Sequence, residues 1–312
     1  MSAKSEQLEG ELEAEDEVCA SCGVAGVDDT KLKKCACLVK YCSNGCQENH
    51  REQHKKECKR RKAELHDKDL FTQPNSSHVG ECPLCCLPLP LIMKNSTMMG
   101  CCSKIICNGC SYANQKRESE QGLQHRCAFC REPISKSDEE SDKQIMERIK
   151  KHDDPVAMTH MGKKHDNEGE YGKALEYWTK AAESGNCEAH YNLGRLYQNG
   201  NGVVKDVKKA IYHFEQAAIG GHPDARGYLG AHEMDNGKFE RAAKHHIIAA
   251  NQGQDISLKL LKDLFVAGVI SKDDYAAALR GYQAAMDATK SAGREKAEEA
   301  EKTTEPGVFV FE

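Results

Sequence analysis

Nearly all the cysteines of this 312-residue chain fall into two compact clusters whose spacing suits metal binding. The first cluster contains Cys19, Cys22, Cys35, Cys37, Cys42, Cys46, His54 and Cys58. The second contains Cys82, Cys85, Cys101, Cys102, Cys107, Cys110, Cys127 and Cys130. Thiolate sulfur and imidazole nitrogen are ligands that zinc prefers, and eight donors suffice for two tetrahedral sites. The sequence therefore predicts four Zn2+ ions per chain as the cofactor.

The composition fits small modules joined to a helical array better than one large core. Hydrophobic residues make up 39% of the chain, aromatic residues 6% and charged residues 30%. Neither cysteine cluster is long enough to bury a stabilising core alone, so bound metal must supply much of its folding free energy. The elements that position the cysteines are therefore expected to be short turns and single helices.

The charge and hydropathy of the chain limit which partners and which cellular compartment are expected. The formal net charge is -5, and metal-bound thiolates would lower it further, which argues against nucleic acid as a partner. No apolar run is long enough for a transmembrane helix, and the acidic first 17 residues contain no secretory signal, so no membrane partner is expected. Dense cysteine without secretion favours metal binding in a reducing compartment, cytoplasmic or nuclear.

The first cluster combines close cysteine pairs with two donors on one helical face. Cys19-x2-Cys22 and Cys42-x3-Cys46 are such pairs, and His54-x3-Cys58 places two donors one turn apart. This order closely resembles the MYND-type zinc finger over residues 18–60, although the second pair, Cys35-Ala36-Cys37, is tighter than usual. His50, one turn before His54, is a rival ligand.

The MYND resemblance implies a cross-braced pair of zinc sites. One zinc would take Cys19, Cys22, Cys42 and Cys46, and the other Cys35, Cys37, His54 and Cys58. The resemblance also implies a protein-interaction module that takes short proline-containing peptides.

The second cluster consists of three Cys-x2-Cys pairs and the adjacent pair Cys101-Cys102. This order over residues 80–136 resembles an all-cysteine RING finger. The resemblance implies one zinc on Cys82, Cys85, Cys107 and Cys110, and a second on Cys101, Cys102, Cys127 and Cys130. Of the two remaining cysteines, Cys86 is expected to be a spare surface thiol and Cys187 a helix-packing residue.

A RING finger implies an E3 ubiquitin ligase, which catalyses by positioning a ubiquitin-conjugating enzyme rather than through a nucleophile of its own. The resemblance places an apolar contact with that enzyme at Leu84 and a hydrogen-bonding contact at Arg131. Three positions depart from the family pattern: Lys104 replaces a histidine ligand, Ala128 replaces a proline, and the only tryptophan is Trp178. The alternative is a non-catalytic adaptor or scaffold for protein–protein interaction.

From Pro155 onward the sequence repeats. Double alanines recur at 181–182, 217–218, 249–250 and 284–285, a period that indicates a helix-turn-helix solenoid. The segment from Gly194 to Ala225 resembles the Sel1-like repeat, which implies a concave face for a client protein. Within it, Asp206 is expected to cap a helix whose Ala210 and Phe214 face inward. Clustered histidines such as His245 and His246 are interpreted as packing or surface residues.

The fold class is therefore a multidomain chain: two small cross-brace zinc modules followed by an all-α helix-turn-helix solenoid. The expected domains are a disordered acidic tail (1–17), a MYND-type finger (18–60), a helix end and linker (61–79), a RING-type finger (80–136), a linker helix (137–154), about four Sel1-like repeats (155–290) and a tail (291–312).

Overall fold

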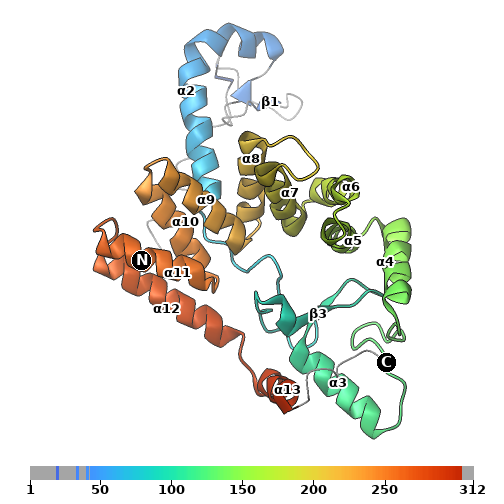
Figure 1. The fold of residues 1–312 in the computed structure, drawn as a ribbon. Helices are drawn as coiled ribbons and strands as arrows, with labels where there is room; N and C mark the ends of the chain where they lie inside the picture. The colour runs from blue at the N-terminus through green and yellow to red at the C-terminus, as the bar shows by residue number, and fades with distance from the viewer. Residues whose placement is uncertain (1–18, 21–32, 35–39, 42, 304–312) are drawn as a thin grey trace. The chain divides into compact units, whose positions relative to one another are not determined.

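The computed structural model describes residues 19–20, 33–34, 40–41 and 43–303, and the chain divides into two compact units (Figure 1). The first unit is Met1–Thr72 and the second is Gln73–Glu312. No helix among the described residues is both long and apolar enough to cross a membrane.

The described part of the first unit is a short hairpin and one long helix. Strand β1 (Lys33–Lys34) pairs antiparallel with β2 (Lys40–Tyr41), with Lys33 opposite Tyr41. Helix α2 (Asn44–Leu70) begins at Ser43, whose side chain accepts a hydrogen bond from the Cys46 N–H at 3.1 Å. Such a cap satisfies one of the free N–H groups of the first turn.

The second unit begins with a cysteine-rich module made mostly of turns. The 3-10 helix η1 (Met93–Asn95) precedes β3 (Ser96–Met98), which pairs antiparallel with β4 (Ile105–Cys107). Helix α3 (Asn108–Glu120) follows directly. The module's buried core consists of Cys82, Leu89, Ile106, Cys107 and Cys127. Three of these five are cysteines, so apolar burial alone gives this module little stability.

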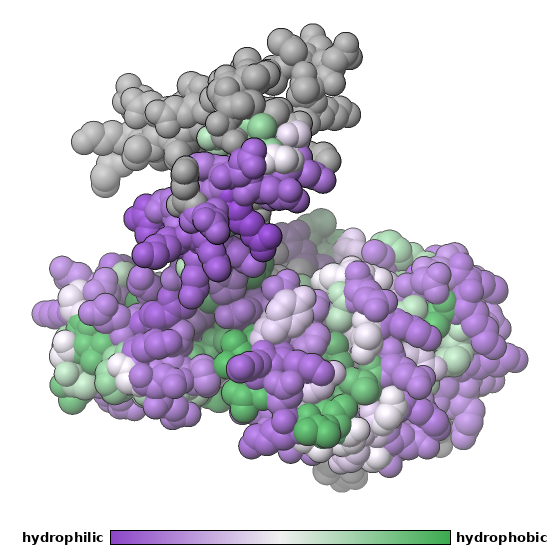
Figure 2. Space-filling model, turned by 90° about the horizontal axis from the view of Figure 1, so that it is seen from above, coloured by the Kyte–Doolittle hydropathy of each residue, from purple (hydrophilic) through white to green (hydrophobic). Residues whose placement is uncertain are grey.

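Ten helices complete the described chain. Their bounds are α4 (Asp138–His152), α5 (Pro155–Asn167), α6 (Tyr171–Glu183), α7 (Cys187–Asn199), α8 (Val207–Ile219), α9 (Pro223–Asp235), α10 (Phe239–Asn251), α11 (Asp255–Val266), α12 (Lys272–Ala288) and α13 (Ala292–Thr303). From α5 to α12 they pack in successive pairs, and each pair packs against the next. The helices from α5 to α12 thus form the all-helical solenoid that the fold class predicted. Figure 2 shows one face of the molecule as mostly hydrophilic, with hydrophobic residues in separate patches.

A glycine facing a ring recurs in the first three helix pairs. Gly162 lies against the indole of Trp178, Gly194 against the ring of Phe214, and Gly230 against the ring of His246. A β-carbon added at Gly194 or at Gly230 would lie 2.6 Å from that ring. Each glycine therefore allows the two helices of its pair to approach closely.

The second helix pair shows the local signals that the sequence predicted. The Asp206 carboxylate accepts the Lys209 N–H at 3.0 Å as the N-cap of α8. Ala210 and Phe214 are buried, as expected. Gly200 ends α7 in the left-handed region, at φ 78°, where glycine is favoured.

The fourth pair, α11 and α12, departs from this pattern. The double alanines of α6, α8 and α10 are buried, but Ala284 is exposed and Ala285 is only partly buried. This exposure suits the last pair of the stack, because a terminal repeat has no further neighbour to bury its outer face.

Residues 292–303 lie in the C-terminal segment that was expected to be a frayed helix or a tail. They form α13, which packs against α3 of the cysteine-rich module. Ala297 is buried in this contact, and a β-carbon at Gly109 of α3 would lie 2.8 Å from the backbone nitrogen of Arg294. The packing joins segments almost two hundred residues apart, which periodicity along the sequence could not indicate.

Candidate metal centres

The structure brings two sets of four cysteine sulfurs together in the second unit. Within each set all Sγ atoms lie within 4.8 Å of one another. The sets are Cys82, Cys85, Cys107 and Cys110, and Cys101, Cys102, Cys127 and Cys130. These are the two groups that the RING resemblance implied, and they alternate along the chain.

The spacing and chemistry of both sets fit zinc. The Sγ atoms of Cys85 and Cys107 lie 3.8 Å apart, as do those of Cys102 and Cys127. Zn–S bonds of about 2.3 Å in a tetrahedron give a sulfur–sulfur edge of about 3.8 Å. Four thiolates and no oxygen donor favour zinc over magnesium or calcium. Bound zinc would hold the turns of the module together and would leave no coordination position open for catalysis.

Two of the cysteine pairs sit on turns with the same backbone hydrogen bonds. The Cys82 N–H donates to the Leu87 carbonyl at 3.0 Å, and the Cys86 N–H donates to the Cys82 carbonyl at 2.9 Å. In the other turn the Cys127 N–H donates to Glu132 at 2.7 Å, and the Arg131 N–H donates to Cys127 at 3.0 Å. Leu84 and Phe129 therefore occupy equivalent positions, each between two cysteines.

The adjacent pair Cys101-Cys102 uses a third turn of this kind. The Met99 N–H donates to the Lys104 carbonyl at 2.9 Å, and the Ser103 N–H donates to the Met99 carbonyl at 2.7 Å. Met99 thus takes the place of the first cysteine, Cys102 takes the place of the second, and Cys101 lies between them. The turn therefore lets both Cys101 and Cys102 direct a sulfur into the second four-cysteine set, although Lys104 stands where the family pattern has a histidine ligand.

Backbone N–H groups also lower the pKa of a cysteine thiol in the first set. Burial alone would raise the pKa of Cys82, but hydrogen bonds from the N–H groups of Cys107, Cys85 and Leu84 lower its pKa to about 7. Metal ligands need the thiolate form, and such donors favour it.

Arg294 of α13 reaches the first four-cysteine set from outside. Its Nη2 lies 3.8 Å from Cys85 Sγ, and its Nη1 donates to the Pro88 carbonyl at 2.7 Å. The side chain is buried, with 8% of its surface exposed. A zinc with four thiolates has a net charge of -2, so a buried guanidinium beside it offsets charge and orients a ligand.

A buried carboxylate connects Arg131 to α3. Glu118 accepts from Arg131 Nη2 at 2.9 Å and from the Arg126 N–H at 3.0 Å, while Arg131 Nη1 donates to Asn114 at 2.9 Å. Burial would raise the pKa of Glu118, but the hydrogen bonds from Arg126, Arg131 and Asn114 outweigh it and hold the pKa below its usual value. Arg131 therefore ties the last cysteine turn to α3.

The first cluster is described only in part. Cys19 is buried, and Cys46, His54 and Cys58 lie on α2. The imidazole of His50 stacks on that of His54, with ring centroids 5.3 Å apart, so both histidines stay near the expected ligand position. Cys22, Cys35, Cys37 and Cys42 lie outside the described residues.

Three side chains outside the cysteine sets also bring metal-type donors together. Glu188 Oε2 lies 3.0 Å from His78 Nε2 and 3.1 Å from His222 Nε2, and its other oxygen accepts from Lys163 Nζ at 2.7 Å. The two imidazoles are stacked, with centroids 3.9 Å apart, so their Nε2 atoms do not point at one tetrahedral centre. The three side chains instead form a hydrogen-bonded link that holds His78 against the helices. His222, His78 and Lys163 outweigh burial and hold the pKa of Glu188 far below its usual value.

The two cysteines outside the clusters and the adjacent histidines of α10 behave as expected. Cys86 is exposed, and the Cys187 Sγ donates to the Gly220 carbonyl at 3.3 Å in a helix contact. His245 and His246 are buried packing residues of α10.

Comparisons with known proteins agree with the first cluster and the helical pairs. Residues 19–58 match the family model of the MYND finger, and residues 157–186 and 187–222 match that of the Sel1 repeat. The chain carries a MYND finger and Sel1 repeats. The MYND finger binds zinc, and its matched segment begins at Cys19 and ends at Cys58.

Similar proteins cover only parts of the chain. "DAP3-binding cell death enhancer 1" from Rattus norvegicus and its counterpart from Mus musculus are each 34% identical over 56 residues, which is 18% of this chain and 11% of the relative. The chain thus spans about a tenth of the length of these relatives.

Solved structures that resemble part of the chain include a Sel1 repeat protein and a protein with an SLR fold. One, from Oxalobacter formigenes, has a TM-score of 0.43 and 26% identity over 57% of this chain and 72% of that chain. Another is the protective antigen c5321 of uropathogenic Escherichia coli, with a TM-score of 0.39 and 19% identity over 63% of this chain and 40% of that chain.

Proposed function

We propose that residues 80–136 form a RING-type finger and that the chain acts as an E3 ubiquitin ligase whose MYND finger and Sel1 repeats select protein partners. The observation that carries this proposal is the alternation of the two four-cysteine sets along the chain. Two zincs bound in this alternating way would fix three turns around α3 without a large core.

The exposed apolar side chains of the cysteine turns support a protein-docking role. Leu84 and Phe129 occupy equivalent turn positions and are 41% and 43% exposed, and Ile92 is 55% exposed. These exposures are present with α13 packed on α3, so α13 leaves the apolar positions accessible. A conjugating enzyme docked on Leu84 and Phe129 would bury apolar area held in place by two metal sites.

Arg131 can serve both the module and a partner. Its Nη atoms each use one hydrogen toward Asn114 or Glu118, and 47% of its side chain stays exposed. Each Nη carries a second hydrogen, so the guanidinium can bridge α3 and a docked protein.

Substrate selection would fall to the other modules. The MYND finger would take short proline-containing peptides, and the Sel1 repeats would bind a client protein. We propose a reducing compartment, cytoplasm or nucleus, because the free thiols that hold zinc would form disulfides in an oxidising one.

An autoubiquitination assay with purified, zinc-loaded full chain and a panel of conjugating enzymes tests the proposal. The wild type should form ubiquitin chains with at least one enzyme, and Leu84→Ala should lose most of that activity while keeping its zinc. Arg131→Ala should also lose activity, and Arg280→Ala on α12 is the matched control that should retain it. If no enzyme of the panel yields chains, the non-catalytic adaptor is the better account.

A further inference from the structure

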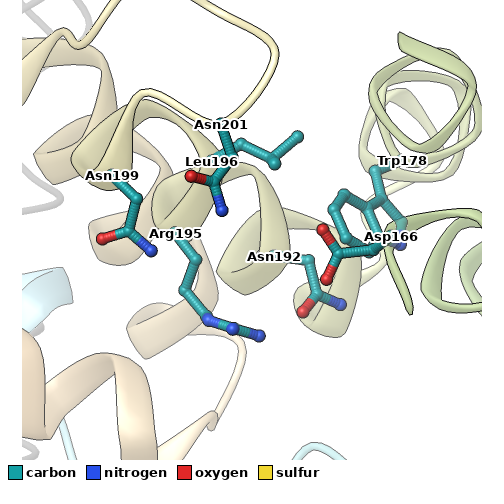
Figure 3. A pocket seen from close by; sticks show the side chains of 7 residues that line it. All are labelled: Asp166, Trp178, Asn192, Arg195, Leu196, Asn199 and Asn201. Atoms are coloured by element: carbon teal, nitrogen blue, oxygen red, sulfur yellow. The ribbon is translucent and has the colours of Figure 1, made fainter. Parts of the chain in front are cut away.

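A small hollow lies between the first two Sel1 repeats (Figure 3). The space inside is about 10 Å3, which suits about one water molecule, so the hollow is not a ligand pocket. The residues that line it are Asp166, Trp178, Asn192, Arg195, Leu196, Asn199 and Asn201. One turn before Asn192 on α7, Glu188 meets a segment of chain from outside the repeats.

Residues 73–79, at the start of the second unit, dock against the turn that precedes α9. The His78 N–H donates to the Gly221 carbonyl at 3.1 Å, and the same carbonyl accepts from Gln252 Nε2 at 2.9 Å. A β-carbon at Gly221 would lie 2.8 Å from the Ser76 carbonyl oxygen, so glycine allows this close approach. The segment is therefore held on the Sel1 helices by polar contacts.

Two imidazoles share one carboxylate oxygen where this segment docks. Glu188 Oε2 accepts from His78 Nε2 at 3.0 Å and from His222 Nε2 at 3.1 Å. Each neutral ring therefore carries its proton on Nε2, and its Nδ1 is an acceptor. Both Nδ1 atoms are buried and have no hydrogen-bond partner among the described residues. The docked segment thus suits two neutral rings.

We infer that the link between His78, Glu188 and His222 is acid-sensitive: it holds residues 73–79 on the Sel1 helices while both rings are neutral and releases them when the rings are protonated. Protonation adds an N–H at Nδ1, and a buried donor without an acceptor is costly. Two charged rings would also repel each other, because their centroids lie 3.9 Å apart.

The charges that face the link do not offset two added protons. Lys163 of α5 lies 2.7 Å from the second oxygen of Glu188 and already balances that carboxylate. Asp224 of α9 faces His222 as a further anion and accepts from Gln254. One more carboxylate balances one of the two added charges, so the doubly protonated link keeps an excess of positive charge.

The rings around His222 also favour its neutral form. Tyr191 of α7 stacks on it with centroids 4.2 Å apart, and burial raises the pKa of Tyr191, so this side chain stays uncharged in acid. Burial, assisted by His78, outweighs Glu188 and holds the pKa of His222 below its usual value. The docked state therefore binds fewer protons than the released state, and its stability is full above about pH 6.5 and falls below it.

The segment connects the MYND finger to the cysteine-rich module. Release of residues 73–79 would free up to about 23 Å of chain, at about 3.3 Å per residue, and so lengthen the connection between the two modules. The inference does not depend on the proposed ligase.

Hydrogen exchange of the zinc-loaded full chain tests it, measured by mass spectrometry at about pH 7.5 and about pH 5.5, on either side of an ordinary histidine pKa. After correction for the intrinsic exchange rate, protection of residues 73–79 should fall at least about tenfold in acid. His78→Gln keeps a donor for Glu188 but does not titrate, so its protection should fall only about threefold. His152→Gln, on the exposed face of α4, is the matched control and should behave like wild type.

The three proteins carry the same cysteines, so any effect of acid on metal binding is common to them. The inference is overturned if wild-type protection is equal at both pH values, or if His78→Gln loses as much protection as wild type. NMR titration of wild type is a second readout, which decides the matter even if His78→Gln does not dock. The His222 ring should titrate below about pH 6.5 as protection is lost, and titration above that value would contradict the inference.

Discussion

At the scale of residues, the three cysteine turns depend on one left-handed backbone position each. Cys86, Ser103 and Arg131 have φ values of 55°, 54° and 64°, although none is glycine. In each turn, this left-handed residue is the one whose N–H donates one of the two backbone hydrogen bonds that close the turn. Side chains are tolerated there at a cost, which metal binding at the neighbouring cysteine can offset.

This geometry predicts different outcomes for two adjacent cysteines. Cys86→Gly should retain every zinc and fold at least as stably as wild type, because glycine adopts the left-handed region readily. Cys85→Gly should lose one zinc, because it removes a sulfur from the first set. Metal content by native mass spectrometry compares the two variants, and loss of zinc from Cys86→Gly would show that Cys86 is a ligand.

Arg294 gives a second prediction at this scale. Arg294→Leu should weaken one zinc site about 10- to 100-fold, the usual effect of losing an outer partner of a metal ligand. Competition with a chromophoric chelator measures the affinity, and Arg280→Leu is the control. Equal zinc affinity at all sites in both variants would show that Arg294 does not support the Cys85 ligand.

The resemblance of the second cluster to a RING finger was enough to predict which residues form each four-sulfur set in the second unit. It was not enough to show how Cys101 and Cys102 could both contribute. That depends on Met99 taking the first position of a turn, and no residue type in the sequence marks such a turn. The network of Glu118 with Arg131 was also missed, because an acidic residue on a polar helix gives no sign that it is buried.

At the scale of elements, the Sel1 helix pairs are held together by small residues facing rings. Alanine pairs and glycines recur in the sequence, so the helices, their period and the cap at Asp206 could be predicted. The partner of each glycine could not, because Trp178, Phe214 and His246 differ in type and share only their position.

This packing predicts opposite effects for the same substitution at two glycines. Gly194→Ala should lower the free energy of unfolding by about 1–3 kcal/mol, because the added methyl meets the Phe214 ring. Gly172→Ala in α6 should be neutral or stabilising by up to about 1 kcal/mol, since open space surrounds that position. Denaturant unfolding followed by Trp178 emission measures both, and equal effects would contradict the close approach of α7 and α8.

The C-terminal helix α13 shows what cannot be predicted from local sequence composition. Its composition of Lys, Glu and Ala predicts a frayed helix, yet Arg294 and Ala297 are buried against the cysteine-rich module. Packing between distant segments overrides local propensity, and only the folded chain shows which face of a charged helix is covered.

At the scale of the whole molecule, the chain combines metal-binding modules with a helical solenoid. The MYND finger binds zinc, and we propose that the cysteine-rich module also needs zinc for its shape, whereas the Sel1 repeats gain their stability from apolar burial between stacked helices. Chelation should therefore unfold the cysteine-rich part while the Sel1 helices persist.

The number of zinc ions bound to the full chain tests the account most directly. Native mass spectrometry of the purified wild type should show four zincs, and Cys107→Ser should show three. A wild type with two zincs would mean that one of the two cysteine clusters was wrongly assigned as a pair of zinc sites. If Cys107→Ser then also keeps both zincs, the four-sulfur sets of residues 80–136 hold no metal, and both the RING-type finger and the proposed ligase are wrong.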